Sequence, residues 1–252
     1  MRTRRVPCEW AVVLGIAGYP VSHSLTPRLF VAVGRHLGIE GPQRVFLEAA
    51  DIDEFEHRLA ELDGDVWLSC TAPLKHAPQD RLGVTGPEGV NAINQLKRTQ
   101  GEWTGTSTDG LGFVAACRHI DIEPAGSVLR MRGGGSAARA IAAAWADAGG
   151  LLIPEQGRRA LVSGPWDRAV VADGRADLGI DLDAAPAGGQ SDPIDAETQV
   201  SISYGDGAGT DEFAVVMVAA QHLEAWKSIF APELAAELPS LSLLLERISV
   251  AP

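Results

Sequence analysis

The sequence has few cysteines, and their spacing forms no familiar framework. Cys8, Cys70 and Cys117 are the only three, and no two of them form a C-x-x-C pair. The histidines show no cluster at metal-ligand spacing either. We therefore expect neither a disulfide framework nor a structural metal site, and a reducing cytoplasm fits this composition best.

The sequence also lacks an excess of basic charge and a long apolar run. Its formal net charge is −12, which argues against a nucleic-acid or anionic-membrane partner, because both require basic surface. A small anionic substrate held by a few local groups stays compatible with that charge. No segment approaches the roughly 20 apolar residues that span a bilayer. The apolar run near the N-terminus is short and follows Glu9, so it predicts a buried strand rather than a secretory signal.

What the sequence does contain is typical of a globular α/β protein. It is 46% hydrophobic and 21% charged over 252 residues, enough for one large domain or two modest ones. Strand and helix signals alternate along its first part, which implies parallel pairing in a layered α/β domain. The expected strands are 10–18, 44–49, 65–70, 90–98 and 101–109, and the expected helices are 25–38 and 51–62.

Both of these helices carry start signals. Thr26 is predicted to cap the first helix, with Pro27 at the first helical position and Gly38 as the stop. Asp51, with Glu54 three residues later, places an acceptor at the cap of the second helix and a carboxylate in its first turn, where free amide donors need partners.

A second unit is expected to begin near Asp109, with a helix over 109–120. The stretch 127–150 predicts a strand, a glycine turn and an alanine-rich helix. Short strands are then expected at 151–155, 159–164, 168–172, 176–182 and 200–204, with a loop over 183–198 and two helices over 211–230 and 232–248.

The glycine turn "GGGSAA" (133–138) fits the pattern G-x-G-x-x-A between a strand and a helix. In a dinucleotide-binding unit the first glycine allows a tight turn and the second lets the backbone approach a pyrophosphate, while the start of the helix supplies amide donors. A purely structural glycine turn is the alternative. The candidate cofactor-binding residues are Gly133, Gly134, Gly135, Ser136 and Ala137.

The end of the next strand bears on which dinucleotide binds. Glu155 lies 20 residues after Gly135, where a carboxylate can accept hydrogen bonds from the ribose hydroxyls of NAD and would repel the extra phosphate of NADP. Arg158 and Arg159 follow, and they could reach that phosphate or lie in a solvated turn. The choice between NAD and NADP stays open, with a slight preference for NAD.

One lysine has unusual surroundings. Lys75 follows a predicted buried strand in "LSCTAPLKHAPQD" (68–80), two residues after a proline. A solvated loop lysine is the ordinary interpretation. A catalytic lysine at the mouth of a cleft is the alternative.

Several short motifs, taken in order, resemble those of the shikimate dehydrogenase family. The four in the first half are "GYPVSHSLTP" (18–27, resembling G-x-P-x-x-H-S-x-S-P), "SCTAPLK" (69–75, N-V-T-x-P-x-K), "NAINQL" (91–96, G-A-V-N-T-L) and "TGTSTDGLGF" (104–113, G-x-N-T-D-G-x-G-F). Two looser ones follow, "GGGSAAR" (133–139, G-A-G-G-A-A-R) and "MVAAQHLEAW" (217–226, M-L-x-x-Q-A).

This resemblance implies an α/β architecture of two domains. A three-layer α/β substrate-binding domain would cover residues 1–108 and be completed by C-terminal helices within 211–252. A Rossmann-like dinucleotide-binding domain would cover 109–210. The implied reaction is the reversible, NADP(H)-linked reduction of 3-dehydroshikimate to shikimate. The partner is then a small molecule, and a monomer and a homodimer are both compatible with the sequence.

The resemblance also implies roles for particular residues. Lys75 and Asp109 would be the catalytic pair. The substrate-binding residues would be Ser24 and Thr26 at the carboxylate, Tyr204 near it, and Thr71, Asn94, Asp109 and Gln221 at the hydroxyls and the reacting oxygen. An ammonium suits this chemistry, because hydride addition to a carbonyl carbon builds negative charge on its oxygen, which a positioned lysine can stabilise and protonate. Helix caps and a core amide are the structural alternatives for several of these side chains.

The sequence departs from the family pattern, mostly in its second half. Ser69 replaces the usual Asn, and the His-Asn of the first motif is lost around Phe30. The segments 154–156, 181–184 and 213–217 replace motifs expected at the cofactor. These departures leave open a dehydrogenase for quinate or another cyclohexene carboxylate, and a shikimate-binding paralogue without turnover. A folate-type dehydrogenase is also open, although "SHSLTP" argues against it.

Overall fold

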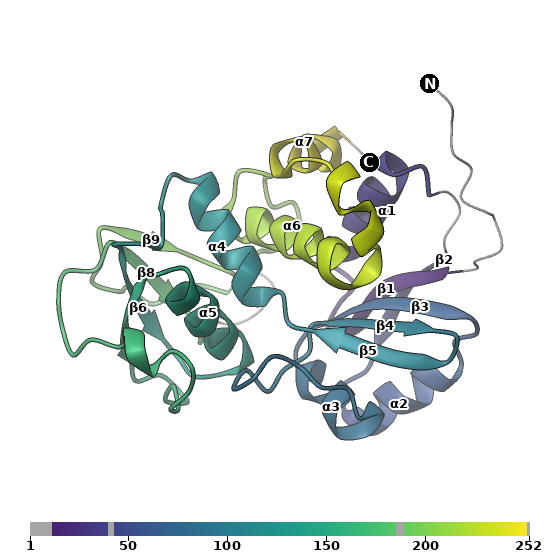
Figure 1. Ribbon diagram of the computed structural model, residues 1–252, viewed down its shortest axis with the longest axis horizontal. Coiled ribbons are helices and arrows are strands. Elements are labelled where there is room, and N and C mark those ends of the chain that lie inside the picture. Colours follow the sequence, from purple (N-terminus) through teal and green to yellow (C-terminus); the bar gives the residue numbers. More distant parts are fainter. Residues whose placement is uncertain (1–11, 40–42, 185–188, 251–252) are drawn as a thin grey trace. The chain divides into compact units, whose positions relative to one another are not determined.

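A computed structural model describes residues 12–39, 43–184 and 189–250, and its ribbon is drawn in Figure 1. The chain divides into two compact units. The first comprises Met1–Pro87, Asn91–Ser107 and His222–Pro252, and the second comprises Glu88–Val90 and Thr108–Gln221. The C-terminal division therefore falls after Gln221, inside a helix, rather than at the expected position 211.

The first unit is built on a five-stranded mixed sheet. Its strands are β1 (Val12–Gly18), β2 (Gln43–Glu48), β3 (Asp65–Cys70), β4 (Gln95–Thr99) and β5 (Glu102–Thr106), in the order β2-β1-β3-β4-β5. The first three strands pair in parallel, as predicted, because a helix crosses between each consecutive pair. The last two strands pair antiparallel, and no helix separates them along the chain. A two-residue turn of Gln100 and Gly101, both at positive φ, joins them as a hairpin.

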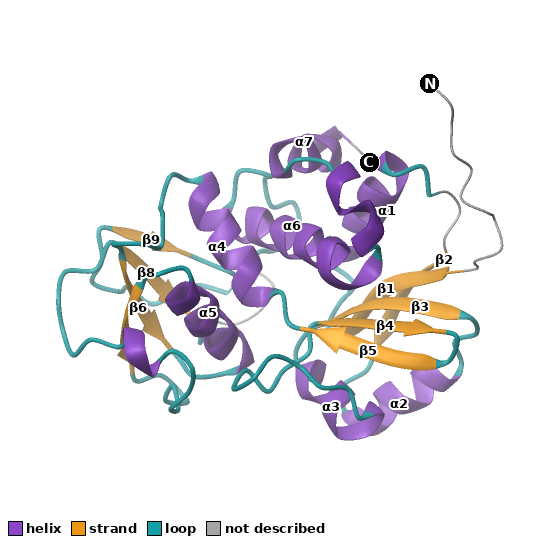
Figure 2. Cartoon of the chain, viewed as in Figure 1, coloured by secondary structure: helices purple, strands orange, loops and turns teal. Residues whose placement is uncertain are grey.

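Helices cover both faces of this sheet (Figure 2). They are α1 (Thr26–His36), α2 (Ile52–Ala60), α3 (Ala77–Leu82) and α7 (Leu241–Val250), with short helical turns at Leu74–His76 (η1) and Pro232–Glu237 (η4) and a π-helical segment at Trp226–Phe230 (η3). Alternate residues of β3 serve opposite faces. Leu68 joins the core beneath α2 and α3, whereas Trp67 stacks on Phe230 with 5.4 Å between ring centroids. The unit is thus a three-layer α/β structure, as predicted.

The two predicted helix caps have different outcomes. The prediction for Asp51 is confirmed, because its side chain accepts hydrogen bonds from the amides of Asp53 and Glu54. The prediction for Thr26 is wrong. Leu25 occupies the cap position without a side-chain cap hydrogen bond, and Thr26 is the first helical residue.

The second unit contains a parallel four-stranded sheet. Its strands are β6 (Val128–Arg132), β7 (Leu151–Glu155), β8 (Leu178–Asp181) and β9 (Thr198–Val200), in the order β7-β6-β8-β9. Its helices are α4 (Asp109–His119), α5 (Ser136–Asp147) and the first part of α6 (Phe213–Ala225). The chain leaves β6 through α5 to β7 and then returns to the other side of β6, which is the reversal seen in Rossmann-like sheets. The predicted Rossmann-like sheet is confirmed.

Two predicted strands, 159–164 and 168–172, do not form. Between β7 and β8 the chain has only a 3₁₀ turn at Asp167–Ala169 (η2) and an isolated bridge from Val170 to Leu152. Asp167 accepts hydrogen bonds from the Ser163 hydroxyl and the Gly164 amide. Such local bonds satisfy the backbone in place of a sheet ladder.

The strand predicted at 200–204 is largely wrong for the same reason. β9 ends at Val200, and the Ser201 hydroxyl then accepts a hydrogen bond from the Ser203 amide at 3.1 Å.

Among the described residues, every helix is too short or too polar to traverse a bilayer.

Close contact between α4 and α5 organises the second unit. A Cβ atom built on Gly110 would lie 2.0 Å from the carbonyl oxygen of Ala140 and 2.8 Å from the Ala144 Cβ. Only glycine allows this approach of the two helices. Further along α4, Phe113 packs edge-on against Phe213 of α6 with 5.7 Å between ring centroids, which ties the first part of α6 to this unit.

We expect Gly110→Ala to lower the free energy of unfolding by about 1–3 kcal/mol, because the added methyl group collides with the backbone of α5. Gly34→Ala is the matched control. Gly34 is also helical, but the nearest atom to an added Cβ lies at 3.5 Å, so this substitution should be neutral or stabilise by up to about 1 kcal/mol. Urea unfolding followed by circular dichroism measures both, and equal midpoints would contradict the close packing.

Candidate active site

Two loops meet at one edge of the first unit's sheet. The carboxyl ends of β1 and β3 lie at the same edge because these strands are parallel. The Tyr19 amide donates to the Ala72 carbonyl oxygen at 3.0 Å. A Cβ atom on Gly18, whose φ is +154°, would lie 2.4 Å from the Thr71 methyl carbon. The motif after β1 and the motif after β3 are therefore held side by side.

The segment before β4 arrives at the same edge, since β4 runs antiparallel to β3. The Cys70 amide donates to the Asn94 carbonyl oxygen at 2.8 Å, and the Ile93 amide donates to the Lys75 carbonyl oxygen at 2.6 Å. Asn94 is buried, while Lys75 is half-buried in the turn η1. Burial raises the pKa of the Cys70 thiol to about 12, and the positive charge of Lys75 opposes this rise. The ammonium group therefore lies within electrostatic reach of the end of β3.

The two hydroxyl candidates lie at the start of α1. The Ser24 hydroxyl accepts a hydrogen bond from the Thr26 amide at 3.2 Å. Thr26 is buried, and its Oγ1 lies 3.2 Å from Nε2 of His222 on α6. Residues Ser24, Thr26, Thr71, Lys75 and Asn94 thus all belong to the loops and helix start at one edge of this sheet.

His222 was not among the residues predicted from the sequence. It is buried, and burial lowers its pKa to about 3. One signal could have identified it, because it follows Gln221 at a place where the resembled motif M-L-x-x-Q-A has alanine.

The remaining substrate-site candidates belong to the second unit. Asp109 is the first residue of α4 and is 2% exposed. Gln221 lies on α6, and Gly112 of α4 allows its close approach, because an added Cβ would come within 2.2 Å of the Gln221 Cγ. Tyr204 is half-buried in the irregular segment that follows β9. The predicted pairing of Asp109 with Lys75 stays a prediction, and so do the predicted substrate contacts of Gln221 and Tyr204.

The predicted glycine turn lies between β6 and the start of α5. Gly133 has a φ of +107°, and Gly135 precedes Ser136, the first residue of α5. A Cβ on Gly135 would have no atom within 4 Å, whereas one on Gly134 would lie 2.0 Å from the Ala160 carbonyl oxygen. The protein backbone covers Gly134 and leaves Gly135 open beside the free amides of the helix start.

The carboxylate of Glu155 is engaged by protein cations. Its two oxygens lie 3.4 Å from Arg130 and 3.1 Å from Arg132. Arg132 also lies 3.7 Å from the buried carboxylate of Asp181. The negative charge that led us to favour NAD is therefore largely balanced within the protein.

Basic side chains gather near the glycine turn instead. Arg139 donates to the Val90 carbonyl oxygen at 2.7 Å and to the Gly134 carbonyl oxygen at 3.2 Å. Burial lowers the pKa of Arg139, and the nearby positive charge of Arg159 lowers it further. Arg158 lies 3.6 Å from Asp183. A bound anion would relieve the repulsion between Arg139 and Arg159.

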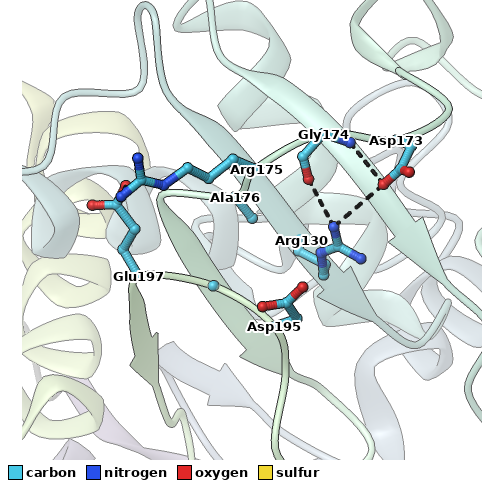
Figure 3. A pocket seen from close by; sticks show the side chains of 8 residues that line it. Arg130, Asp173, Gly174, Arg175, Ala176, Asp195 and Glu197 are labelled. Atoms are coloured by element: carbon cyan, nitrogen blue, oxygen red, sulfur yellow. Dashed lines mark hydrogen bonds and ion pairs between the residues drawn. The ribbon is translucent and has the colours of Figure 1, made fainter.

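A separate depression of about 530 Å³ occupies another part of the second unit (Figure 3). It is lined by Arg130, Asp173, Gly174, Arg175, Ala176, Asp195, Ala196 and Glu197. The segments 173–176 and 195–197 precede β8 and β9, so the depression lies at the amino ends of these strands, whereas the glycine turn follows the carboxyl end of β6. Arg175 pairs with Glu197 at 2.6 Å, and Arg130 donates to Gly174 at 2.8 Å. We do not assign this depression to the candidate site.

Comparison with known proteins supports the resemblance found in the motifs. No family model matches the chain. It is 35% identical over 141 residues to the shikimate dehydrogenase (NADP(+)) of Xylella fastidiosa strain M12, covering 53% of this chain and 49% of that protein. It is 36% identical over 141 residues to the enzyme of the same name from Haloarcula marismortui, covering 54% and 52%. The chain thus matches about half the length of these relatives.

Solved structures extend the likeness over most of the fold. Shikimate 5-dehydrogenase from Thermus thermophilus in complex with shikimate aligns with a TM-score of 0.71 at 22% identity, covering 94% of this chain and 98% of that one. The same enzyme with NADP(H) and shikimate aligns with a TM-score of 0.69 at 19% identity and the same coverage. The two-domain α/β fold class predicted from the sequence and the resemblance to shikimate dehydrogenases are confirmed.

The buried imidazole of His222 predicts a fold that weakens in acid. The unfolded chain binds a proton there below about pH 6.5, whereas the folded chain resists it until about pH 3. The free energy of unfolding should therefore fall as the pH drops through this window, by up to ~1.4 kcal/mol per pH unit from this group.

Urea midpoints measured from about pH 7 to about pH 4.5 test this sign. His222→Gln removes the titrating group and should flatten the dependence. His57→Gln, at an exposed imidazole of α2, should leave the slope of the wild type unchanged. Equal slopes in the wild type and His222→Gln would exclude a neutral, buried His222.

Proposed function

We propose that this protein catalyses the reversible, nicotinamide-dependent reduction of 3-dehydroshikimate to shikimate. The observation that carries the proposal is the convergence of Ser24, Thr26, Thr71, Lys75 and Asn94 on one edge of the first unit's sheet. Three sequence motifs, each resembling its counterpart in shikimate dehydrogenases, supply these side chains. The relatives named shikimate dehydrogenase (NADP(+)) add support.

Lys75 is the group we assign to proton transfer. A bound nicotinamide supplies or accepts the hydride. As negative charge grows on the carbonyl oxygen, the Lys75 ammonium stabilises it and donates a proton to that oxygen, and in the reverse direction the amine takes the proton from the hydroxyl. Asp109 is proposed to orient Lys75 and to favour its charged form.

The substrate carboxylate is proposed to bind at Ser24 and Thr26. Hydroxyls hold a carboxylate through neutral hydrogen bonds, which reconciles an anionic substrate with a protein of net charge −12. Thr71, Asn94 and Gln221 are assigned to the ring hydroxyls and the reacting oxygen. Tyr204 is assigned, through the resemblance alone, to the vicinity of the carboxylate.

The cofactor is proposed to be NADP(H), bound along the start of α5. The open face of Gly135 and the first amides of the helix, at Ser136 and Ala137, fit a pyrophosphate. Glu155 was expected to favour NAD. Its pairing with two arginines and the positive charge of Arg159 beside Arg139 make an extra phosphate acceptable there.

Absorbance at about 340 nm with shikimate or quinate, each with NADP⁺ and NAD⁺, tests the activity and its substrate. We expect reduction of NADP⁺ with shikimate. A stronger signal with quinate would select the alternative substrate. Calorimetric binding of shikimate without turnover with either cofactor would select a binding paralogue, a possibility kept open by the departures at 154–156 and 181–184.

Lys75→Ala should lower kcat by about 10²–10⁴-fold with little change in KM for shikimate, because the interaction matters chiefly in the transition state. The matched control is Lys227→Ala, at an exposed lysine paired with Glu224 on the protein surface. It should retain wild-type kinetics. An unchanged kcat in a folded Lys75→Ala variant would remove Lys75 from the mechanism.

Arg159→Ala should raise KM for NADP⁺ by roughly tenfold while changing KM for NAD⁺ much less, since only NADP carries the phosphate that a guanidinium would pair with. Arg168→Ala serves as the control, because Arg168 pairs with Asp147 at the surface. Equal effects of Arg159→Ala on both cofactors would argue against a phosphate contact.

A further inference from the structure

A buried histidine contacts the proposed carboxylate-binding motif. His222 of α6 places Nε2 at 3.2 Å from the Oγ1 of Thr26. Its ring packs edge-on against Phe30, with 4.8 Å between centroids and 84° between planes. The exposed fraction is 1% for His222, 3% for Thr26 and 0% for Phe30, and all three residues belong to the first unit. The contact is therefore a tightly enclosed feature of that unit.

The surroundings of the imidazole indicate which nitrogen carries the hydrogen. Among the described residues, Nδ1 of His222 is buried without a hydrogen-bond partner. The ring is neutral because burial lowers its pKa to about 3. An orphaned buried N–H is rarer than an under-satisfied acceptor, so the hydrogen belongs on Nε2. His222 then donates to the Thr26 hydroxyl oxygen.

This donation fixes the role of the hydroxyl. A threonine hydroxyl has one hydrogen to give and accepts through its oxygen. With a lone pair of Oγ1 turned toward His222, the hydroxyl hydrogen must point elsewhere. Ser24 is prepared in the same way, because its Oγ already accepts from the Thr26 amide. The oxygen of each hydroxyl thus accepts a hydrogen bond from a protein group, and the hydroxyl hydrogen can be donated to an anion.

The histidine also occupies an unusual position in the sequence. In the resembled family the first motif is followed by His-Asn, which this chain has lost around Phe30. The chain has His222 where the last motif has alanine, and the ring of His222 touches the ring of Phe30. The chain thus lacks the family's histidine on α1, but His222 of α6 places an imidazole beside the same motif.

We propose that His222 is a positioning residue, which holds the Thr26 hydroxyl as a hydrogen-bond donor to the carboxylate of the substrate. The role rests on the proposed function. It predicts that His222 contributes to binding of the acid and not to the chemical step.

Three variants separate this role from simple packing. His222→Phe keeps a ring and loses the donor, His222→Gln keeps an N–H donor, and Thr26→Val removes the hydroxyl. Isothermal titration calorimetry with shikimate and with its methyl ester measures binding of the anion and of its neutral counterpart. Thermal melts establish that each variant is folded.

We expect His222→Phe to weaken binding of shikimate roughly tenfold, because a hydrogen bond to a charged group is lost or misdirected. Binding of the methyl ester should change less than about twofold. In turnover assays KM for shikimate should rise while kcat stays within about twofold. His222→Gln should restore most of the affinity, and the double variant with Thr26→Val should lose no more than Thr26→Val alone.

A spectroscopic measurement on the wild-type protein gives an independent readout. ¹⁵N spectra of the histidine side chains should contain one neutral imidazole protonated at Nε2, whose signals do not change from about pH 5 to about pH 8. His222→Gln assigns it by loss of that signal. A neutral ring protonated at Nδ1 would overturn the proposal, whatever the binding results, and this holds even where His222→Phe fails to fold.

The remaining outcomes are distinct. Wild-type affinity in a folded His222→Phe variant, or equal losses for the acid and the ester, would overturn the positioning role while leaving the proposed function intact. Absence of shikimate binding by the wild-type chain would refute the proposed function, and the role of His222 toward the carboxylate would fall with it.

Discussion

Backbone hydrogen bonds between three loops hold the candidate site of the first unit together. Parallel pairing brings the ends of β1 and β3 to one edge, and antiparallel β4 starts there. The amides of Tyr19, Cys70 and Ile93 then join the loops. None of these bonds requires a particular side chain, so the loops can present varied residues from a fixed frame. Ser24, Thr71 and Lys75 are brought to a common edge of the sheet by this frame.

In the second unit, charged side chains of neighbouring strands lie on one face of the sheet and pair with one another. Leu129 and Met131 of β6 are fully buried, whereas the alternate residues Arg130 and Arg132 point to the other face. Glu155 pairs with both arginines. The crossover from β7 to β8 contains only a 3₁₀ turn and no α-helix. The face of the sheet with Arg130 and Arg132 therefore carries a network of ion pairs, where an apolar surface would pack against a crossover helix. Two of the departures from the cofactor motifs, 154–156 and 181–184, fall in this region, where Glu155 and Asp181 lie within ion-pair distance of Arg132.

Several features were predictable because their signals are local. The cap at Asp51, the glycine turn before α5 and the buried strands each depend on a few consecutive residues. The failures have two causes, a competing local hydrogen bond in one case and a contact with a distant residue in the other. The segment 159–164 has the composition of a strand, yet a carboxylate three residues away satisfies its backbone in a turn. Thr26 has the right type for a cap, yet its hydroxyl lies against a histidine of another helix.

The sequence by itself determined the α/β class, the order of most elements and the motifs that carry the resemblance, because periodicity, caps and glycine spacing act over about ten residues. Tertiary structure alone decided which groups each side chain meets. Thr26 and His222 are 196 positions apart, and Glu155 meets arginines from the neighbouring strand. Hydrogen bonds and ion pairs act over a few ångströms in space, and no spacing along the chain encodes such distances.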